Sequence, residues 1–529
     1  MLDYLIKNAI LVDGTGTPGT PGDLGIQGGK IAAFGALHAA SAAHIVDAHG
    51  AYLTPGFLDI HRHADAALFR PGFGAAELAQ GLTTIVNGNC GLSLSPAPPE
   101  RRAEIYGYLA PVTGEPDPPL ETQTMRSYLD AVSRLPLALN VGMLVGGGTV
   151  RTAAAGFDPQ PLSPEALHTV HTLLEQSLSG GALGVSLGLG YAPECFYTTR
   201  ELIDALAPLR ESGVAISVHM RQEGAGVVQA LEEMLTVARA LKTPVHISHL
   251  KSIGKAYWGR CMPRMLELLS RAREEDLDVS CDLYPYSAGS TQLIHILPPE
   301  AQEGGLAVLT ENLRKPDFRA RMRERMLTGT DFENLSLLVG WENIDVSTVT
   351  RPENSRFVGH SLAELAAQAH ADPFDLAFDL LASEDCDVTM IDRITSEEDI
   401  CAALRAPFSC VISDSTYPTS GLLHPRVYGN CAHLLEHYVR KRGVLTLEQA
   451  VEKLTARPAS LYGLQTKGRL AAGMDADLCL FDLEDIHETA TYSAPEKLAE
   501  GMRYVFVGGV PAIEEGKLTG AANGRVLRR

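Results

Sequence analysis

Short apolar runs alternate with longer amphipathic stretches through the middle of the chain. This alternation predicts βα units arranged around a parallel sheet. The candidate strands are residues 57–60, 83–87, 139–145, 183–187, 215–218, 245–248, 279–283 and 410–413. Eight strands are what a TIM-type barrel requires, so the pattern predicts an α/β fold with a (β/α)8 barrel.

The two ends of the chain have a different pattern. Residues 1–54 and 464–529 consist of short β-type runs separated by glycines. Such spacing predicts strands of a small β-sandwich. We therefore expect one β-sandwich domain built from both termini, with a catalytic barrel between them at residues 55–463.

One connection inside the expected barrel is unusually long. Residues 287–350 exceed an ordinary βα loop. We expect them to form an inserted lid or subdomain over the mouth of the barrel. A ninth apolar run, residues 388–391, is expected outside the barrel.

Composition and charge narrow the classes of function. The 529 residues are 45% hydrophobic and 20% charged, and 44 Lys and Arg against 64 Asp and Glu give a net charge of −20. This acidic balance argues against a protein that binds nucleic acid or an anionic membrane, but not against a small anionic substrate. The sequence shows no signal-peptide pattern, no apolar run near the ~20 residues of a membrane span and no disulfide-like cysteine spacing, so we expect a cytoplasmic protein. We also expect a monomer or small homo-oligomer.

Potential metal ligands follow four of the expected strands. They are His61, His63, Cys90, His219 and His249. The carboxyl ends of parallel barrel strands converge on one face, where active sites form. Imidazole and thiolate suit Zn²⁺, so the sequence predicts a zinc site on this face.

An aspartate follows the last expected strand. Asp414 accepts hydrogen bonds when ionised and could take a proton from a water activated by the metal. The alternative is a structural role, since Asp is also a favoured cap where a strand leads into a helix. The pattern alone leaves both roles open.

Several motifs resemble those of a known family. The stretch GFLDIHRHAD at residues 56–65 resembles the signature of the amidohydrolase superfamily. The more specific stretches are VNGNCG at 86–91, GALGVS at 181–186, SHLK at 248–251, YPY at 284–286, HPRVYG at 424–429 and GRLAAGMDADL at 468–478. Together they resemble the D-aminoacylase, or N-acyl-D-amino-acid deacylase, family over nearly the whole chain.

This resemblance implies a reaction and a set of roles. The reaction is zinc-dependent hydrolysis of an N-acyl-D-amino acid to a carboxylate and a free D-amino acid. One tight zinc is implied at Cys90, His219 and His249, with a possible second, weaker site at His61 and His63 that Cys90 could bridge. Asp414 is implied as the base that takes the proton from water and passes it to the leaving amine.

The resemblance also implies contacts to the substrate. Lys251, Tyr284, Ser290 and Arg426 lie in segments that match those binding the α-carboxylate in the family, and Tyr191 lies in a loop expected near the barrel mouth. Members that act on acidic substrates place an Arg after the YPY stretch. Here that segment has Gln292 and apolar neighbours and no Arg or Lys, which predicts a pocket for neutral or hydrophobic D-residues.

Two features bear on rival functions. The fourth expected strand has no Lys to serve as the carboxylated bridging ligand of many amidohydrolases, which weakens a hydantoinase-like or dihydroorotase-like function on a cyclic amide. Gly147 stands where relatives usually have His, and its consequence for the pocket is open. A D-dipeptide substrate and an inactive amidohydrolase-like scaffold are further alternatives, although every expected ligand and Asp414 are present.

Overall fold

Eight parallel strands form the centre of the computed structural model, which describes residues 1–37, 40–115 and 120–529. The strands are β6 (Phe57–Asp59), β7 (Leu82–Asn87), β8 (Asn140–Gly146), β9 (Gly184–Gly188), β10 (Ile216–His219), β11 (Val245–Ile247), β12 (Val279–Leu283) and β16 (Ser409–Val411). Each strand pairs with its predecessor, except that β16 follows β12 directly in the sheet. The eight predicted barrel strands are thus confirmed.

The first and last strands meet just beyond their carboxyl ends. Arg62 and Ser415 form a parallel bridge, and the backbone N–H of Asp414 donates to the carbonyl of His61 at 2.9 Å. Apolar side chains from several strands, such as Ile60, Leu144 and Leu183, fill the interior beneath this rim. The rim is therefore supported by a packed core rather than an open channel.

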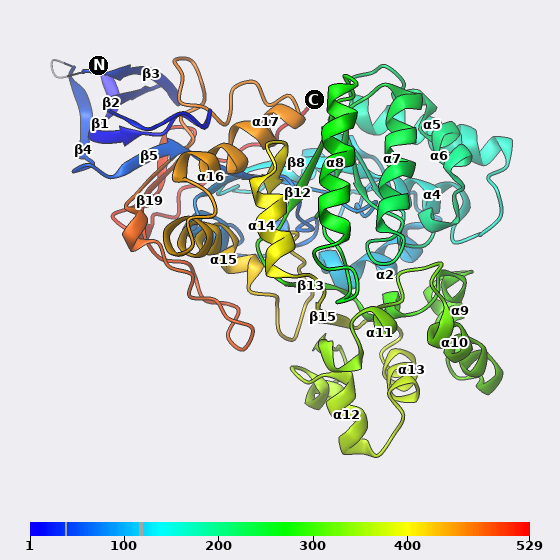
Figure 1. Cartoon of the computed structure of the whole chain (residues 1–529). Helices are drawn as coiled ribbons and strands as arrows, with labels where there is room; N and C mark the ends of the chain where they lie inside the picture. Colours follow the sequence, from blue (N-terminus) through cyan, green and yellow to red (C-terminus); the bar gives the residue numbers. More distant parts are fainter. Residues whose placement is uncertain (38–39, 116–119) are drawn as a thin grey trace.

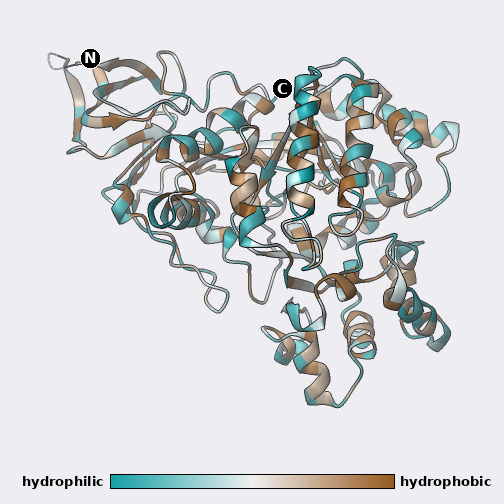
Figure 2. Ribbon diagram, in the orientation of Figure 1, coloured by the Kyte–Doolittle hydropathy of each residue, from teal (hydrophilic) through white to brown (hydrophobic). Residues whose placement is uncertain are grey.

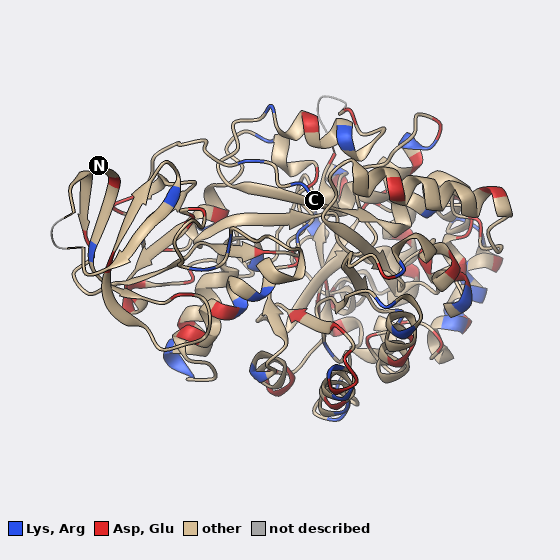
Figure 3. Ribbon diagram, turned by 90° about the horizontal axis from the view of Figure 1, so that it is seen from above, with Lys and Arg blue, Asp and Glu red and all other residues tan. Residues whose placement is uncertain are grey.

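Helices surround the strands because their apolar positions recur every three or four residues. They are α1 (Ala75–Ala79), α2 (Arg102–Thr113), α3 (Met125–Val132), α4 (Gly147–Ala155), α5 (Pro164–Ser179), α6 (Thr199–Ala205), α7 (Val227–Leu241), α8 (Cys261–Glu274), α14 (Glu397–Arg405), α15 (Arg426–His433), α16 (Leu447–Leu454) and α17 (Ala456–Leu461). In α7, Val227, Leu231, Met234 and Leu241 are buried, and Figure 2 shows apolar and polar segments alternating along α7 and α8. Charged residues gather mainly on the outer helices and loops (Figure 3).

Strands from both termini form a second sheet at one side of the barrel (Figure 1). It contains β1 (Leu2–Leu11), β2 (Thr20–Gln27), β3 (Lys30–Gly35), β4 (Ala42–Asp47), β5 (Tyr52–Pro55), β17 (Leu478–Phe481), β18 (Met502–Val507), β19 (Val510–Glu514) and β20 (Lys517–Leu518). The joint between the two ends is the antiparallel pairing of β5 with β17. The sheet encloses its own apolar cluster, which includes Ile6, Leu24, Leu53 and Phe506.

A segment between β12 and β16 leaves the barrel and projects beside it (Figure 1). Its strands β13 (Ala288–Gln292), β14 (Ile344–Thr348) and β15 (Thr389–Arg393) form an antiparallel sheet in the order β13-β15-β14. Its helices are α9 (Leu306–Asn312), α10 (Pro316–Thr328), α11 (Leu335–Leu338), α12 (Leu362–Ala369) and α13 (Pro373–Ser383). The ninth apolar run is β15, so the excursion extends past the expected end at residue 350. The domain boundaries at 54/55 and 463/464 stay predictions.

No helix within the described ranges combines the length and the apolar character needed to cross a bilayer.

Candidate active site

Two histidines project from the rim where β6 ends. His61 and His63 are fully or almost fully buried and alternate with Arg62. Arg62 turns the other way, where it contacts Glu77 at 2.8 Å and Asp59 at 3.3 Å. The period-two alternation of extended backbone therefore sends both imidazoles into the barrel mouth and the guanidinium into the wall.

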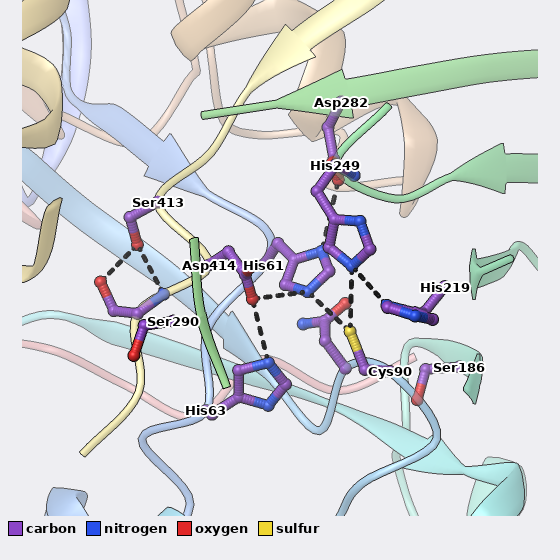
Figure 4. Close-up of polar contacts among 12 residues, drawn as sticks. His61, His63, Cys90, Ser186, His219, His249, Asp282, Ser290, Ser413 and Asp414 are labelled. Atoms are coloured by element: carbon purple, nitrogen blue, oxygen red, sulfur yellow. Dashed lines mark hydrogen bonds and ion pairs between the residues drawn. The ribbon is translucent and has the colours of Figure 1, made fainter. Parts of the chain in front are cut away.

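Cys90 lies on a tight turn after β7. Its backbone φ is +53°, in the left-handed region, and the N–H of the next residue, Gly91, donates to Ser186 Oγ at 3.0 Å. The turn aims the thiol between two imidazoles (Figure 4). Its Sγ lies 3.2 Å from His61 Nε2 and 3.4 Å from His249 Nε2.

The remaining two histidines come from the opposite strands of the barrel. His219 ends β10 and His249 follows β11, and His219 Nδ1 lies 3.0 Å from His249 Nε2. Cys90 belongs to two donor groups, one of His61, His63, Cys90 and Asp414 and one of Cys90, His219 and His249. His219 also lies in a third group with Glu223 and Glu333, and within each group the ligand atoms lie within 4.8 Å of one another.

This donor set fits zinc. Four imidazoles and one thiol surround a space lined by soft and borderline ligands, the chemistry that zinc prefers. Burial raises the pKa of the Cys90 thiol, but His61 and His249 outweigh burial and hold that pKa well below its ordinary value. The thiolate, which is the form that binds a metal, is therefore favoured.

Asp414 faces the same space from the end of β16. Its Oδ1 lies 3.2 Å from His63 Nε2, and its Oδ2 lies 3.2 Å from Arg426 Nη2. Burial raises the pKa of the carboxyl, but Arg426, His61 and His63 hold it well below its usual range. An ionised carboxylate beside the expected metal is a candidate proton acceptor.

Three residues of the site have left-handed backbone. Cys90, His249 and Asp414 have φ values of 53°, 35° and 52°. Such conformations are uncommon outside glycine and occur where the surrounding structure fixes them, often at functional sites.

Two carboxylates that the sequence analysis gave no role hold the histidines in place. Glu223 Oε1 lies 2.9 Å from His249 Nδ1, and Asp282 Oδ2 lies 3.5 Å from His61 Nδ1. Both carboxylates are buried. Partners of this kind fix the tautomer and the orientation of ligand imidazoles. Asp282 lies one residue before the end of a predicted strand, a position that indicates a site residue, whereas Glu223 lies in a loop with no such indication.

Glu223 offers a direct test of this support. We expect Glu223→Gln to weaken zinc binding by about 10- to 100-fold, because a neutral amide replaces the carboxylate that contacts both His249 Nδ1 and Lys251 Nζ. The measurement is competition with a chelator. Glu233→Gln, which alters an ion pair with Arg221 at 2.9 Å, is the matched control and should leave zinc affinity unchanged. Equal affinities in the Glu223 variant and the wild type would contradict the role.

The residues expected to bind a carboxylate gather around one aromatic ring. Lys251 Nζ and the Arg426 guanidinium carbon lie 5.8 and 4.5 Å from the centroid of Tyr284. Arg426 Nη2 also donates to the carbonyl of Ser290 at 3.2 Å. Lys251 is tied to Glu223 at 2.5 Å. Four residues from four segments thus form one cationic wall.

The last two expected contact residues occupy different surroundings. The Tyr191 ring lies between His219 and His295, with both ring centroids 4.2 Å away. Gln292 is fully buried on β13, where its amide donates to the carbonyl of Tyr108 on α2 at 3.0 Å. Tyr191 therefore contacts an expected ligand directly, whereas Gln292 packs against a barrel helix.

Comparisons with known proteins agree with this geometry. The model of the amidohydrolase family matches residues 44–513. A D-aminoacylase of Alcaligenes xylosoxydans xylosoxydans is 33% identical, with 100% of this chain and 98% of the relative covered. The N-acyl-D-aspartate deacylase of the same organism is 33% identical over 99% of this chain and 95% of the relative. The crystal structure of N-acyl-D-glutamate deacylase from Bordetella bronchiseptica, complexed with zinc and a phosphonate inhibitor, has a TM-score of 0.85, 30% identity and full coverage of both chains.

The barrel, the donor groups at its strand ends and the family match define a metal-dependent amidohydrolase. More narrowly, the identity over its full length shows that the chain belongs to the D-aminoacylase family, whose members hydrolyse linear amide bonds. The resemblance inferred from the motifs is confirmed.

Proposed function

We propose that this enzyme hydrolyses N-acyl-D-amino acids with neutral or hydrophobic side chains. The observation that carries the proposal is the placement of Asp414. Its carboxylate lies against His63 of one donor group and against Arg426 of the cationic wall. A substrate whose α-carboxylate met that wall would present its neighbouring amide to the donor groups.

Each part of the site has a role in this reaction. Cys90, His219 and His249 would hold one tight zinc, and His61 and His63, with Cys90, a second and weaker one. Bound zinc would polarise the amide carbonyl and make water more acidic. Asp414 accepts the proton of the water and returns it to the departing amine.

The cationic wall supports a free α-carboxylate in the substrate. Arg426 is fully buried, and its Nε and Nη1 have no hydrogen-bond partner among the described residues, so its charge can meet a carboxylate in a medium where the two interact strongly. Lys251 is 6% exposed and is already paired with Glu223 at 2.5 Å. A guanidinium presents two parallel donors to a carboxylate. A cyclic amide without that carboxylate would leave the wall unused, and β9, Gly184–Gly188, contains no Lys that could serve as a bridging ligand.

A small cavity beside His219 supports the neutral side-chain preference. Its volume is about 90 Å³, and Tyr191, His295, Leu297, Phe332 and Glu333 are among its lining residues. In the described part of the chain, Arg221 is the only Lys or Arg that lines it. The guanidinium donates to Glu233 and to the carbonyls of Cys195 and Tyr197 at 2.8–2.9 Å, so its donors are already engaged.

A second substrate carboxylate would therefore have no free cation in this cavity. Burying it unpaired costs several kcal/mol. Glu333 lines the same cavity and supplies no positive charge, since burial and Glu223 raise its pKa to about 8 and leave the acid largely neutral near pH 7.

A comparison of substrates tests the proposal. We expect kcat/KM for N-acetyl-D-leucine and N-acetyl-D-glutamine to exceed that for N-acetyl-D-glutamate by at least about 10²-fold, the equivalent of roughly 3 kcal/mol. The L-enantiomers serve as controls and should be hydrolysed far more slowly. A preference for the D-glutamate compound would overturn the neutral pocket, and turnover of a cyclic amide alone would overturn the substrate class.

A further inference from the structure

A buried carboxylate that takes no part in the proposed chemistry lies behind the Cys90 turn. Glu194 is 2% exposed and begins a short 3-10 helix, Glu194–Phe196, after β9. Its Oε2 accepts a hydrogen bond from the backbone N–H of Gly188 at 2.7 Å, and its Oε1 has no hydrogen-bond partner among the described residues. A buried carboxylate oxygen without a partner is costly and calls for an explanation.

Glycines make room for this side chain. A Cβ on Gly147 would overlap Glu194 Oε1, and a Cβ on Gly91 would overlap Oε2. The carboxylate thus fills the space that any side chain at position 147 would enter. Position 147 is the one where the family resemblance leads us to expect His.

Glu194 also completes the start of a helix. The N-cap of α4, Gly146, offers no side-chain hydrogen bond, and the first turn contains no acidic residue. The carboxylate of Glu194 lies at this end, with Gly148 next to Oε2. A hydrogen-bond acceptor is favourable there because the first N–H groups of a helix lack partners within the helix.

The two elements that Glu194 joins both hold the turn that carries Cys90. On α4, the N–H of Thr149 donates to the carbonyl of Gly91 at 3.1 Å. On β9, Ser186 Oγ accepts from the N–H of Gly91 at 3.0 Å. A Cβ on Gly188 would overlap the carbonyl of Cys90, so the end of β9 lies directly against the turn.

We propose that Glu194 is a positioning residue for Cys90, and that its carboxylate occupies the volume that a side chain at position 147 would need. The proposal rests on the zinc site described under Proposed function. Burial raises the pKa of Glu194 to about 8, against the effects of Gly188 and Arg151, so the acid is largely neutral at pH 7. Its contribution is then hydrogen bonding and volume more than charge.

Zinc affinity, measured by chelator competition, tests the positioning role. Glu194→Ala should weaken zinc binding by about 10- to 100-fold, the range for residues that orient metal ligands. Glu194→Gln keeps the shape and an acceptor for Gly188, so it should stay within a few-fold of wild type. Glu384→Ala is the matched control: this buried carboxylate accepts from the N–H groups of Thr350 and Arg351 in the projecting segment, at 2.7 and 3.0 Å. It should lower thermal stability without changing zinc affinity.

A double-mutant cycle tests whether Glu194 and a side chain at position 147 compete for the same space. Gly147→His alone should weaken zinc binding, because the imidazole collides with Glu194. Gly147→His combined with Glu194→Ala should bind zinc more tightly than Gly147→His alone. If Glu194→Ala fails to fold, recovery of folding and zinc binding in the double variant supports the proposal equally.

Two results would overturn it. One is a Glu194→Ala protein that loses thermal stability but binds zinc as tightly as wild type, which is the signature of a purely structural residue. The other is a double variant no better than Gly147→His alone. A wild-type protein without tight zinc would refute the metal site itself, whereas tight wild-type zinc with unaffected variants would refute only the role of Glu194.

Discussion

Asp414→Asn is expected to lower kcat by at least about 10²-fold while the fold and the tight zinc are retained. The amide is nearly isosteric with the carboxylate and cannot accept the proton of the attacking water. Asp414 lies outside the group of Cys90, His219 and His249, so that group keeps its ligands. The measurements are steady-state kinetics with N-acetyl-D-leucine and the zinc content of the purified variant.

A matched control separates the loss of a base from the loss of a buried charge. Asp475 is a buried carboxylate that contacts Lys30 at 2.6 Å and Lys467 at 3.2 Å next to the terminal sheet. Asp475→Asn should lower stability and leave kcat unchanged. Wild-type turnover in Asp414→Asn would show that Asp414 only caps the end of the strand, the alternative that the sequence left open.

The barrel could be predicted because its strands are buried on both faces. Every residue of β7, β8 and β9 is buried, so apolar residues follow one another without alternating with exposed polar ones, as in Ile85-Val86 and Met143-Leu144-Val145. The convergence of His61, Cys90, His219 and His249 then follows from the geometry of a parallel barrel. The fold and the gathering of these side chains at one face were therefore accessible from the order of residues, whereas their role as metal ligands stays a prediction.

Features that depend on contacts between residues far apart in the sequence could not be predicted from the sequence. The projecting segment was expected to end at residue 350, but β15 begins at Thr389 and pairs with β13 about a hundred residues earlier. Glu223 supports His249 across two neighbouring strands, and no spacing along the chain links the two. Gln292 was placed near the substrate from its position in a motif, whereas its side chain is directed at the carbonyl of Tyr108.

The structural consequence of a glycine such as Gly147 could not be predicted from the sequence either. Gly147 could be recognised as a departure from the family, but its consequence needs the position of Glu194, which lies 47 residues further along the chain. The structure relates the two because β9 and α4 meet behind the Cys90 turn.

Cys90→Ala is expected to abolish both tight zinc binding and activity. Cys90 is the one residue shared by the two donor groups, and its Sγ lies 3.2 Å from His61 and 3.4 Å from His249. Cys90→Ala should weaken zinc binding by more than the about 10- to 100-fold expected when a residue that only orients the ligands is replaced. Zinc per chain after dialysis and kcat with N-acetyl-D-leucine measure the two losses.

Two further variants distinguish the donor groups. His61→Ala removes a ligand of the group that lacks His219 and His249, so activity should fall while one zinc per chain remains. Cys479→Ala changes an equally buried cysteine on β17 and should keep both zinc and activity. Full activity in a wild-type preparation shown to be free of metal would refute the assignment, and so would one tight zinc per chain in Cys90→Ala, because the tight site would then not depend on the thiolate.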